Sequence, residues 1–581
     1  MTGRLGPTLG MLALLVGPTR GQSTRPPFLL DVNPPGATVG RSEEWLISGR
    51  NFEGTERVIV SGPGVEVSRL SIVDGSSARV RVQVANDAPN GYREVRLDGP
   101  AGISNPVLIR IDTLRQTAEF DRDGDLSKAQ EVEVGSVVVG LLERGDVDLY
   151  RIRGTPGRPL TLDLEARRIG TSISPVLTIL SLDGVATEQF REPRGGDLDV
   201  RLNAVIPPEG SLLVQVRDVV FGGSDRARYR LRVDPNPFAS AIFPLGGIRG
   251  SNVEVEVSGG SLRAPLRKMV RMPELAGSTV EVGEVDGPEG PTLVPGTLVA
   301  GEGPEILEPF NQPAGSAIDL ESDQVIVNGR ITRPREVDLY RVPVRGGTRF
   351  QARVEAAPLG SWLDSVLVVR DEEGLVLAEN DDSDPAESTP SHGKQDSSVE
   401  FQVQTDGFVT VEVSDRFSDG GPEFGYRLYV GRERPDFSVS LRQGSGKTDP
   451  FGIYNLKPGN TGTIRFRILP IARPGPVEVG VEGLPDGISA DPVRVRLPGP
   501  DQPGKPASPV DDFLRLRVGR DARPGLFEIR VVASAEPRPG QKIVREASTT
   551  LDLGTIEGSA TPIHRTMTRI PLRVLGPLDS P

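Results

Sequence analysis

The sequence lacks cysteine altogether and has only two histidines among its 581 residues. Without cysteine, the chain has no disulfide, no thiol nucleophile and no cysteine-ligated zinc. The histidines, His392 and His564, lie in unrelated segments, and no Gly-x-Ser-x-Gly elbow, His-Glu-x-x-His motif or phosphate-binding glycine loop is present. These absences disfavour a hydrolase, and we predict a protein without a catalytic site.

Aromatic residues and long apolar runs are also scarce. Aromatics make up 5% of the chain, which disfavours the aromatic-lined cleft of a carboxylate-pair glycosidase. After the first two dozen residues, no segment approaches the ~18 apolar residues that a membrane-spanning helix needs. The 67 basic side chains are scattered and the net charge is −13, so nucleic acid is a disfavoured partner.

Turn-forming residues and short alternating strands are abundant instead. The 69 glycines and 53 prolines are spread along the whole chain, as expected where short strands are joined by tight turns. Residues 253–257 read Val-Glu-Val-Glu-Val, and such alternation places one face in a core and the other in water. We therefore predict an all-β protein, and its length predicts about four or five domains.

The first residues have the pattern of an export signal. Arg4 precedes a short apolar stretch at residues 11–16, and small residues surround Gly21. We predict a signal peptide over residues 1–21 and a chain that is secreted, periplasmic or at the cell surface. The alternative is a slightly apolar N-terminal tail without a targeting role.

Two internal repeats organise the chain. The first matches residues 34–52 with residues 244–262 at an offset of 210. The second matches residues 146–151 with residues 336–341 at an offset of 190, which becomes 197 from Asp396 onward and so predicts a seven-residue insertion before it. The order is therefore A-B-A′-B′, followed by a different C-terminal segment.

Segment B′ contains an ordered set of motifs, in chain order Glu308-Pro-Phe-Asn, Val327-Asn-Gly, Asp338-Leu-Tyr, Asp364, Gly374, Asn380-Asp-Asp, Asp396, Gly407 and Tyr426-Arg-Leu. Through this set the B segments resemble the bacterial pre-peptidase C-terminal (PPC) domain, a β-sandwich similar to the collagen-binding modules of clostridial collagenases. B departs from the pattern, since it lacks the Asn-Asp-Asp loop and has Ser174 where B′ has Asp364.

The A segments resemble IPT/TIG immunoglobulin-like domains through Asn33-Pro-Pro-Gly and Ile47-Ser-Gly. Alternating modules of these kinds occur in exported proteins of planctomycete-type bacteria. After the signal peptide we therefore predict five tandem β-sandwich modules: A (28–114, IPT/TIG-like), B (115–236, PPC-like and degenerate), A′ (237–303, shortened immunoglobulin-like), B′ (304–433, PPC-like) and C (434–576, immunoglobulin-like).

Acidic side chains make calcium the candidate cofactor of B′. Ca²⁺ takes six to eight oxygen ligands, and the loop at residues 380–384 concentrates such ligands. The PPC resemblance implies that other acids approach this loop, so the predicted metal-ligating set is Glu308, Asp364, Asn380, Asp381, Asp382 and Asp396. The alternative is a solvated loop whose acids point apart. We predict calcium binding by B′ and not by B.

Two further features have both a structural and a binding interpretation. Asp148-Leu-Tyr and Asp338-Leu-Tyr each place two polar groups on one face of a strand, and we favour an aspartate that ends a turn and a tyrosine in the core. Trp45 and Trp362 have the rings needed to stack on sugars, but with one tryptophan per module we favour core packing.

Together these features predict an exported, non-catalytic, multi-module binding or scaffold protein, with extracellular protein or polysaccharide as its partner. One alternative is an accessory chain that targets a partner hydrolase to a protein or polysaccharide substrate. The third is a carboxylate-based hydrolase.

Overall fold

The computed structural model describes residues 25–576, with gaps at 121–124, 172, 191–198, 295, 310–314, 382–395, 433–434, 443–453, 471–473, 499–507, 554–562 and 568. The predicted signal peptide, Asp382 and His392 lie outside the described residues. Strands and three short 3₁₀ turns make up the regular structure of the described part. No helix within it is long and apolar enough to cross a membrane. The protein is all-β, a tandem array of β-sandwiches, as the sequence predicts.

Module A is a sandwich of two antiparallel-rich sheets. One sheet contains, in spatial order, β1 (Phe28–Asn33), β3 (Ser42–Arg50), β6 (Ser77–Val84) and β5 (Val65–Asp74); the other contains β2 (Gly36–Thr38), β9 (Val107–Asp112), β7 (Gly91–Gly99) and β4 (Arg57–Val60), with β8 (Gly102–Ile103) paired to β7. The favoured interpretation of Trp45 is confirmed, because its ring is fully buried in this core.

Modules B and B′ have the same topology. In B one sheet contains, in spatial order, β10 (Arg115–Ala118), β12 (Ser136–Leu141), β19 (Arg228–Asp234), β14 (Pro159–Glu165) and β17 (Val200–Val205). The other contains β11 (Gln130–Glu133), β13 (Val147–Arg153), β18 (Ser211–Asp218), β15 (Pro175–Leu180) and β16 (Ala186–Phe190). In B′ one sheet contains β28 (Glu305–Leu307), β30 (Val325–Arg330), β37 (Gly425–Arg432), β32 (Arg349–Glu355) and β35 (Ser398–Gln402). The other contains β29 (Ala317–Asp319), β31 (Val337–Val344), β36 (Gly407–Asp415), β33 (Ser365–Arg370) and β34 (Val376–Asn380). Every strand of B thus has a counterpart in the same spatial order in B′, as the internal repeat predicts.

Short 3₁₀ turns complete the two B-type modules. B contains η1 (Leu126–Lys128) and η2 (Arg167–Ile169), and B′ contains η3 (Ala357–Leu359), which follows β32 as η2 follows β14. The segment in which the seven-residue insertion is predicted lies mostly within residues 382–395, outside the described residues.

Module A′ is a reduced relative of A. Its two three-stranded sheets are β20 (Ala241–Phe243), β22 (Asn252–Ser258), β23 (Leu266–Arg271), and β21 (Gly246–Ile248), β27 (Thr297–Gly301), β24 (Thr279–Glu281), with a hairpin of β25 (Val285–Gly287) and β26 (Gly290–Thr292). The short parallel pairing of β21 with β27 repeats that of β2 with β9 in A.

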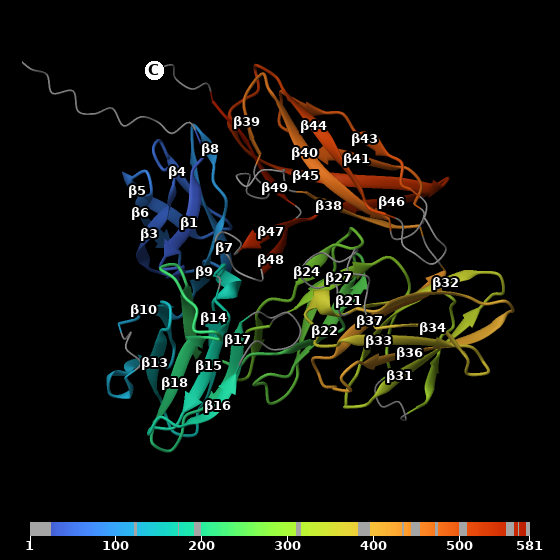
Figure 1. The fold of residues 1–581 in the computed structure, drawn as a ribbon, viewed down its shortest axis with the longest axis horizontal. Coiled ribbons are helices and arrows are strands. Elements are labelled where there is room, and N and C mark those ends of the chain that lie inside the picture. The colour runs from blue at the N-terminus through green and yellow to red at the C-terminus, as the bar shows by residue number, and fades with distance from the viewer. Residues whose placement is uncertain are drawn as a thin grey trace, which may run out of the picture.

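Module C is a larger sandwich. One sheet contains β38 (Phe437–Leu441), β40 (Thr461–Pro470), β44 (Val510–Val518) and β42 (Ile488–Ala490). The other contains β39 (Tyr454–Leu456), β49 (Ile570–Val574), β45 (Gly525–Arg538), β41 (Val477–Glu482) and β43 (Val493–Val495), with β46 (Gln541–Glu546) paired to β45. A separate pair is formed by β47 (Thr549–Leu553) and β48 (Ile563–Met567). Figure 1 shows C, in orange and red, beside A, in blue.

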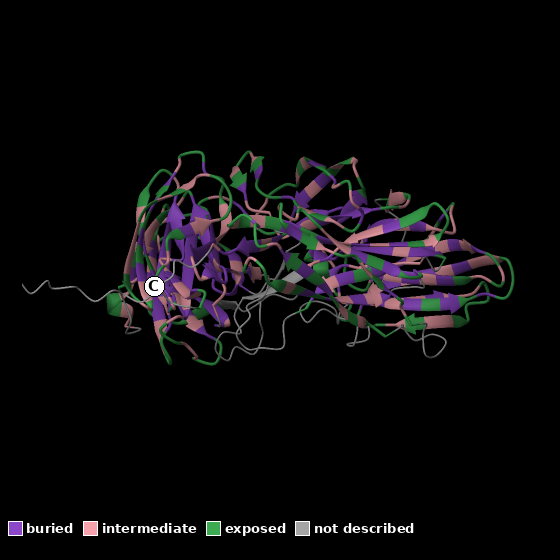
Figure 2. Ribbon diagram, turned by 90° about the horizontal axis from the view of Figure 1, so that it is seen from above, coloured by how far each residue is buried: buried purple, intermediate pink, exposed green. Residues whose placement is uncertain are grey.

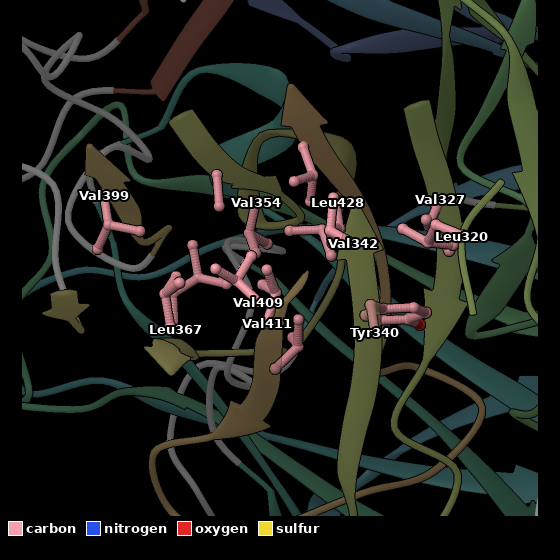
Figure 3. Close-up of a cluster of buried hydrophobic side chains, with 14 of the residues drawn as sticks. Leu320, Val327, Tyr340, Val342, Val354, Leu367, Val399, Val409, Val411 and Leu428 are labelled. Atoms are coloured by element: carbon pink, nitrogen blue, oxygen red, sulfur yellow. The ribbon is translucent and has the colours of Figure 1, made fainter. Parts of the chain in front are cut away.

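Each module has its own hydrophobic core. Alternation along the strands builds these cores: in β6 every second residue is buried, and the residues between them are exposed. Figure 2 shows the same alternation of buried and exposed bands in many strands. In B′, side chains such as Val354, Val409 and Leu428 fill the space between the two sheets, and Tyr340 joins them (Figure 3).

An arginine joins each A-type module to the B-type module that follows it. A Cβ atom on Gly36 of β2 would lie 3.1 Å from Nε of Arg230, and one on Gly246 of β21 would lie 2.5 Å from Nε of Arg427. At Gly36 the carbonyl oxygen of Arg110 would lie closer still, at 2.7 Å, so a side chain at either glycine would crowd the interface. The two arginines occupy matching positions of β19 and β37, so the joint between modules repeats along with the modules themselves.

Candidate functional site

Four of the predicted metal-ligating residues lie near one another at one end of B′. Asp364 precedes β33, Asn380 ends β34, Asp381 follows it, and Asp396 precedes β35. The side chain of Asn380 connects two of these segments, because its Oδ1 accepts the backbone N–H of Ser398 at 3.0 Å. Sequence reasoning therefore located a real concentration of polar side chains.

Glu308 lies in a different part of the same end. It follows β28, and its Oε2 accepts the backbone N–H of Arg330 at 3.0 Å. Its neighbour Asp338 is the second residue of β31, and β36 separates β31 from β33. Glu308 thus lies beside β31, whereas Asp364 lies just before the start of β33.

Asp396 is occupied by the backbone of its own module. Its two carboxylate oxygens accept the N–H groups of Ala356 and Ala357, each at 3.1 Å, at the start of η3. Burial raises the pKa of Asp396 to about 6, while these two hydrogen bonds oppose the rise. Asp199 of B accepts the matching N–H groups of Ala166 and Arg167. This aspartate therefore caps a 3₁₀ turn in both modules.

The exposed loop acid is paired as well. Asp381 forms an ion pair with Arg416 at 3.2 Å, with both side chains about half exposed. Among the described residues, no three aspartates, glutamates or histidines come together in an arrangement that would hold a metal ion. The donor set that the structure describes does not by itself form a calcium site, and calcium binding stays a prediction.

A group of two carboxyls and two tyrosines, the carboxyl–tyrosine cluster, lies in module B, where Asp148, Tyr150 and Tyr229 are buried and Glu119 is half-buried. Tyr229 donates a 2.6 Å hydrogen bond to Oδ2 of Asp148, and its hydroxyl is also hydrogen-bonded to that of Tyr150. The carboxyl of Glu119 lies beside Asp148 and accepts the backbone N–H of Leu141 at 2.8 Å. The core position predicted for Tyr150 is confirmed, whereas Asp148 is buried in the module rather than ending a turn.

Module B′ repeats this cluster with Glu308, Asp338, Tyr340 and Tyr426. Tyr426 donates a 2.6 Å hydrogen bond to Oδ2 of Asp338, and the two tyrosine hydroxyls lie 2.6 Å apart. Glu308 accepts a backbone N–H just as Glu119 does. The residue that sequence reasoning placed with the loop acids is thus a member of a cluster common to both B-type modules.

Burial dominates the electrostatics of these clusters. It raises the pKa of Asp148 to about 10, and the neighbouring Glu119 adds to the rise. Burial likewise raises the pKa of Asp338 to about 8 and that of Glu308 to about 7. The Asp148 side chain is fully buried, so its carboxyl holds a proton at neutral pH and is closed to a substrate.

A network of charged side chains fills the interface between A and B. Arg110 of β9 and Arg230 of β19 both form ion pairs with Glu165 of β14. Arg230 and Arg232 also reach Asp112 of β9, at 3.1 and 2.8 Å. All five side chains are buried. Burial opposes ionisation of Asp112, yet the surrounding arginines hold its pKa below the usual range.

The interface between A′ and B′ uses a simpler version. Arg427 approaches Gly246 and Gly301 of A′, while its own ion pairs, with Glu305 at 2.6 Å and with Glu355 at 3.0 Å, lie within B′. Arg330 adds an ion pair to Glu256 of A′ at 3.3 Å. The sequence analysis did not predict either interface. The feature that could have indicated them is the arginine of the matched Tyr-Arg-Leu motifs, Arg230 and Arg427.

Comparisons with known proteins identify no family for this chain. No family model matches it. A probable subtilase-type serine protease of Deinococcus radiodurans is 23% identical over 338 residues, which cover 54% of this chain and 43% of that protein. The chain therefore spans less than half the length of this relative.

Two of the solved structures similar to the chain come from Bacteroides species. SGBP-B from a xyloglucan utilization locus of Bacteroides uniformis is 12% identical, with 36% of this chain and 73% of that chain covered and a TM-score of 0.15. SGBP-B of a mixed-linkage glucan utilization locus of Bacteroides ovatus is 7% identical, with 68% and 71% covered and a TM-score of 0.12. We draw no role from these two proteins.

Proposed function

We propose that this chain is an exported, non-catalytic scaffold whose β-sandwich modules bind extracellular protein or polysaccharide from fixed relative positions. The observation that carries the proposal is the buried arginine joint, in which Arg230 of B approaches Gly36 of A and Arg427 of B′ approaches Gly246 of A′. Ion pairs between modules accompany both joints, Arg230 with Asp112 and Arg330 with Glu256. Modules that acted independently on flexible linkers would gain nothing from burying charged groups against one another. A scaffold that presents several surfaces in a set geometry needs such joints.

The uses of the acidic side chains support the non-catalytic part of the proposal. Asp396 caps backbone N–H groups, and Asp415 likewise accepts the N–H groups of Asp364, Phe417 and Asp419. In the carboxyl–tyrosine clusters Asp148 and Asp338 are buried, and the half-buried Glu119 and Glu308 accept backbone N–H groups. These carboxylates serve the fold of the B-type modules rather than facing a cleft.

The test is an array of immobilised glycans and extracellular proteins, probed with the chain and scored for both retention and product release. We expect retention on at least one protein or polysaccharide, with no release of peptide, ester or sugar product. Absence of retention on every surface would contradict a binding role. Turnover that is lost on a single Asp, Glu or Ser substitution would contradict a non-catalytic one.

The similarity to a subtilase-type protease favours one second candidate, an accessory chain that brings a partner protease to its substrate. In that case, addition of the chain would speed cleavage of polymer-bound protein by a separately supplied subtilase. Cleavage of a small soluble peptide by the same enzyme would not change. A scaffold without this role leaves both rates unchanged.

Calcium binding by B′ is part of the proposal and has its own test. We expect millimolar calcium to raise the melting temperature of the chain by several degrees, because a ligand at a hundred times Kd stabilises the folded state by about 2.7 kcal/mol. Glu308→Gln and Asp381→Asn then separate the two halves of the predicted set, since the variant that loses the shift marks the half that holds the ion. An unchanged melting temperature of the unsubstituted chain in calcium would contradict the prediction.

A further inference from the structure

The first and last modules of the chain meet through two specific contacts. Asp98 at the end of β7 forms an ion pair with Arg573 of β49, with Oδ1 2.7 Å from Nε. These residues are 475 positions apart in the sequence. Asp98 is 1% exposed and Arg573 is 8% exposed, so water does not screen this pair as it screens a surface one. In Figure 1, β8 of module A lies next to β39 and β49 of module C.

The second contact is made by the side-chain amide of Asn455, which lies in β39. Its Oδ1 accepts the backbone N–H of Ile103 at 2.9 Å, and its Nδ2 donates to the carbonyl of Ile103 at 3.2 Å. The amide thus satisfies the outer edge of strand β8 as a neighbouring strand would. Gly102 permits the approach, because a Cβ atom there would lie 2.5 Å from Cγ of Asn455.

The charges are arranged so that this contact can open. Asp98 also forms an ion pair with Arg57, whose side chain is 58% exposed. If Arg573 leaves, Asp98 keeps a partner, and Arg573 keeps its hydrogen bond to the carbonyl of Val574 in its own module. Neither charge is stranded in a dry interface, which is the outcome that makes breaking a buried ion pair costly.

We propose that modules A and C form a reversible clasp which closes the five modules into a ring, and that release of the clasp converts the chain into an extended form. The inference goes beyond the scaffold role, because it gives the scaffold two shapes. The clasp residues are Asp98, Gly102, Ile103, Asn455 and Arg573. A weaker ion pair joins Arg545 of C to Glu302 of A′, at 3.8 Å with both side chains partly exposed, and is not part of the clasp.

Small-angle X-ray scattering of the full chain tests the clasp. A compact chain of this length has a radius of gyration of ~25 Å, and we expect the unsubstituted chain to be near that value. Arg573→Glu places a second carboxylate against Asp98 and is expected to raise the radius by roughly 20%. Arg530→Glu is the matched control, since it reverses an exposed arginine of the same module that pairs with Glu482 and lies outside the clasp.

A second variant keeps the test decisive if Arg573→Glu fails to fold. Gly102→Val inserts a side chain where the Asn455 amide must approach, without changing any charge. Because the chain has no cysteine, single cysteines at the exposed positions Arg79 of A and Arg517 of C can carry spin labels for a direct distance measurement. The proposal is overturned if folded Arg573→Glu and Gly102→Val both keep the scattering profile and the label distance of the unsubstituted chain, or if that chain is already extended.

Discussion

Replacement of Glu165 by alanine is expected to lower the free energy of unfolding of the A–B pair by about 3–5 kcal/mol, the usual cost of removing one partner from a buried ion pair. Glu165 is fully buried and forms ion pairs with Arg110 from one module and Arg230 from the other. It also accepts the hydroxyl of Tyr92 at 2.9 Å. For a unit of about 200 residues, 1 kcal/mol moves the melting temperature by 2–4 °C. The transition of the A–B pair should therefore fall by roughly 10 °C.

The matched control for this variant is Glu44→Ala. Glu44 pairs with Arg79 at 3.2 Å on the surface of A, where the two side chains are 48% and 63% exposed. An exposed pair of this kind contributes at most about 1 kcal/mol. Differential scanning calorimetry of the full chain measures both variants. If they shift the transition equally, the buried network is not what joins A to B.

A rise in pH from 5 to 9 is expected to destabilise module B through Asp148. Burial, together with the neighbouring Glu119, raises the pKa of Asp148 to about 10 in the folded state, whereas an unfolded aspartate titrates near ~4. Between these two values the folded state binds more protons than the unfolded state. The free energy of unfolding therefore falls as the pH rises, by up to ~1.4 kcal/mol per pH unit for one proton. The loss begins above pH ~4 and is complete above the folded pKa.

Other charged groups set the size of this effect. Tyr229 stabilises the ionised form of Asp148 by its hydrogen bond, while Asp146 adds negative charge and opposes it. Asp148→Asn keeps the size of the side chain and an acceptor for Tyr229 but carries no titrating proton. Hydrogen exchange of module B peptides at pH 6, 7 and 8, corrected for intrinsic exchange, is expected to show a steeper loss of protection in the unsubstituted chain than in this variant. Parallel curves for the two proteins would show that Asp148 does not carry the pH dependence.

The sequence predicted the layout of the sandwiches well because that layout follows from local patterns. Alternating residues specify strands, and the repeat offsets specify which strands correspond. Trp45 was placed correctly in a core, since a single large ring in a small sandwich has few other places to lie. These inferences need only the neighbours of a residue in the chain.

The uses of the polar residues could not be predicted in the same way. Asp396 is occupied by N–H groups that lie about 40 positions earlier in the chain, so its spacing from the loop acids says nothing about its partners. Glu308 and Asp338 come together only when β28 and β31 are placed in opposite sheets. Calcium ligation was inferred from the loop acids and, through the PPC resemblance, from Glu308, Asp364 and Asp396. In the fold, Glu308 and Asp396 accept backbone N–H groups that the sequence does not indicate.

The interface between A and B could not be predicted from the sequence for a related reason. Arg228, Arg230 and Arg232 alternate along β19, which places them on one face of the strand. From sequence alone, such a face is expected to be in water. Here this face of β19 lies against module A. Asp31 and Asp112 of A and Glu165 of B form ion pairs with its arginines. The period of a strand gives its two faces but not which other module covers one of them.

The repeated arginine joint has a consequence for how such a chain can be lengthened or divided. Each A–B pair brings its own glycine gap and its own arginine, Gly36 with Arg230 and Gly246 with Arg427. A duplication that copies a whole pair therefore inherits a finished joint and needs no compensating substitution elsewhere. A cut inside a pair, between residues 112 and 115 for example, would expose buried arginines and acids on both fragments, Arg110 and Asp112 on one and Arg230, Arg232 and Glu165 on the other. For expression of soluble fragments, the pair is thus the smallest unit that leaves this contact intact.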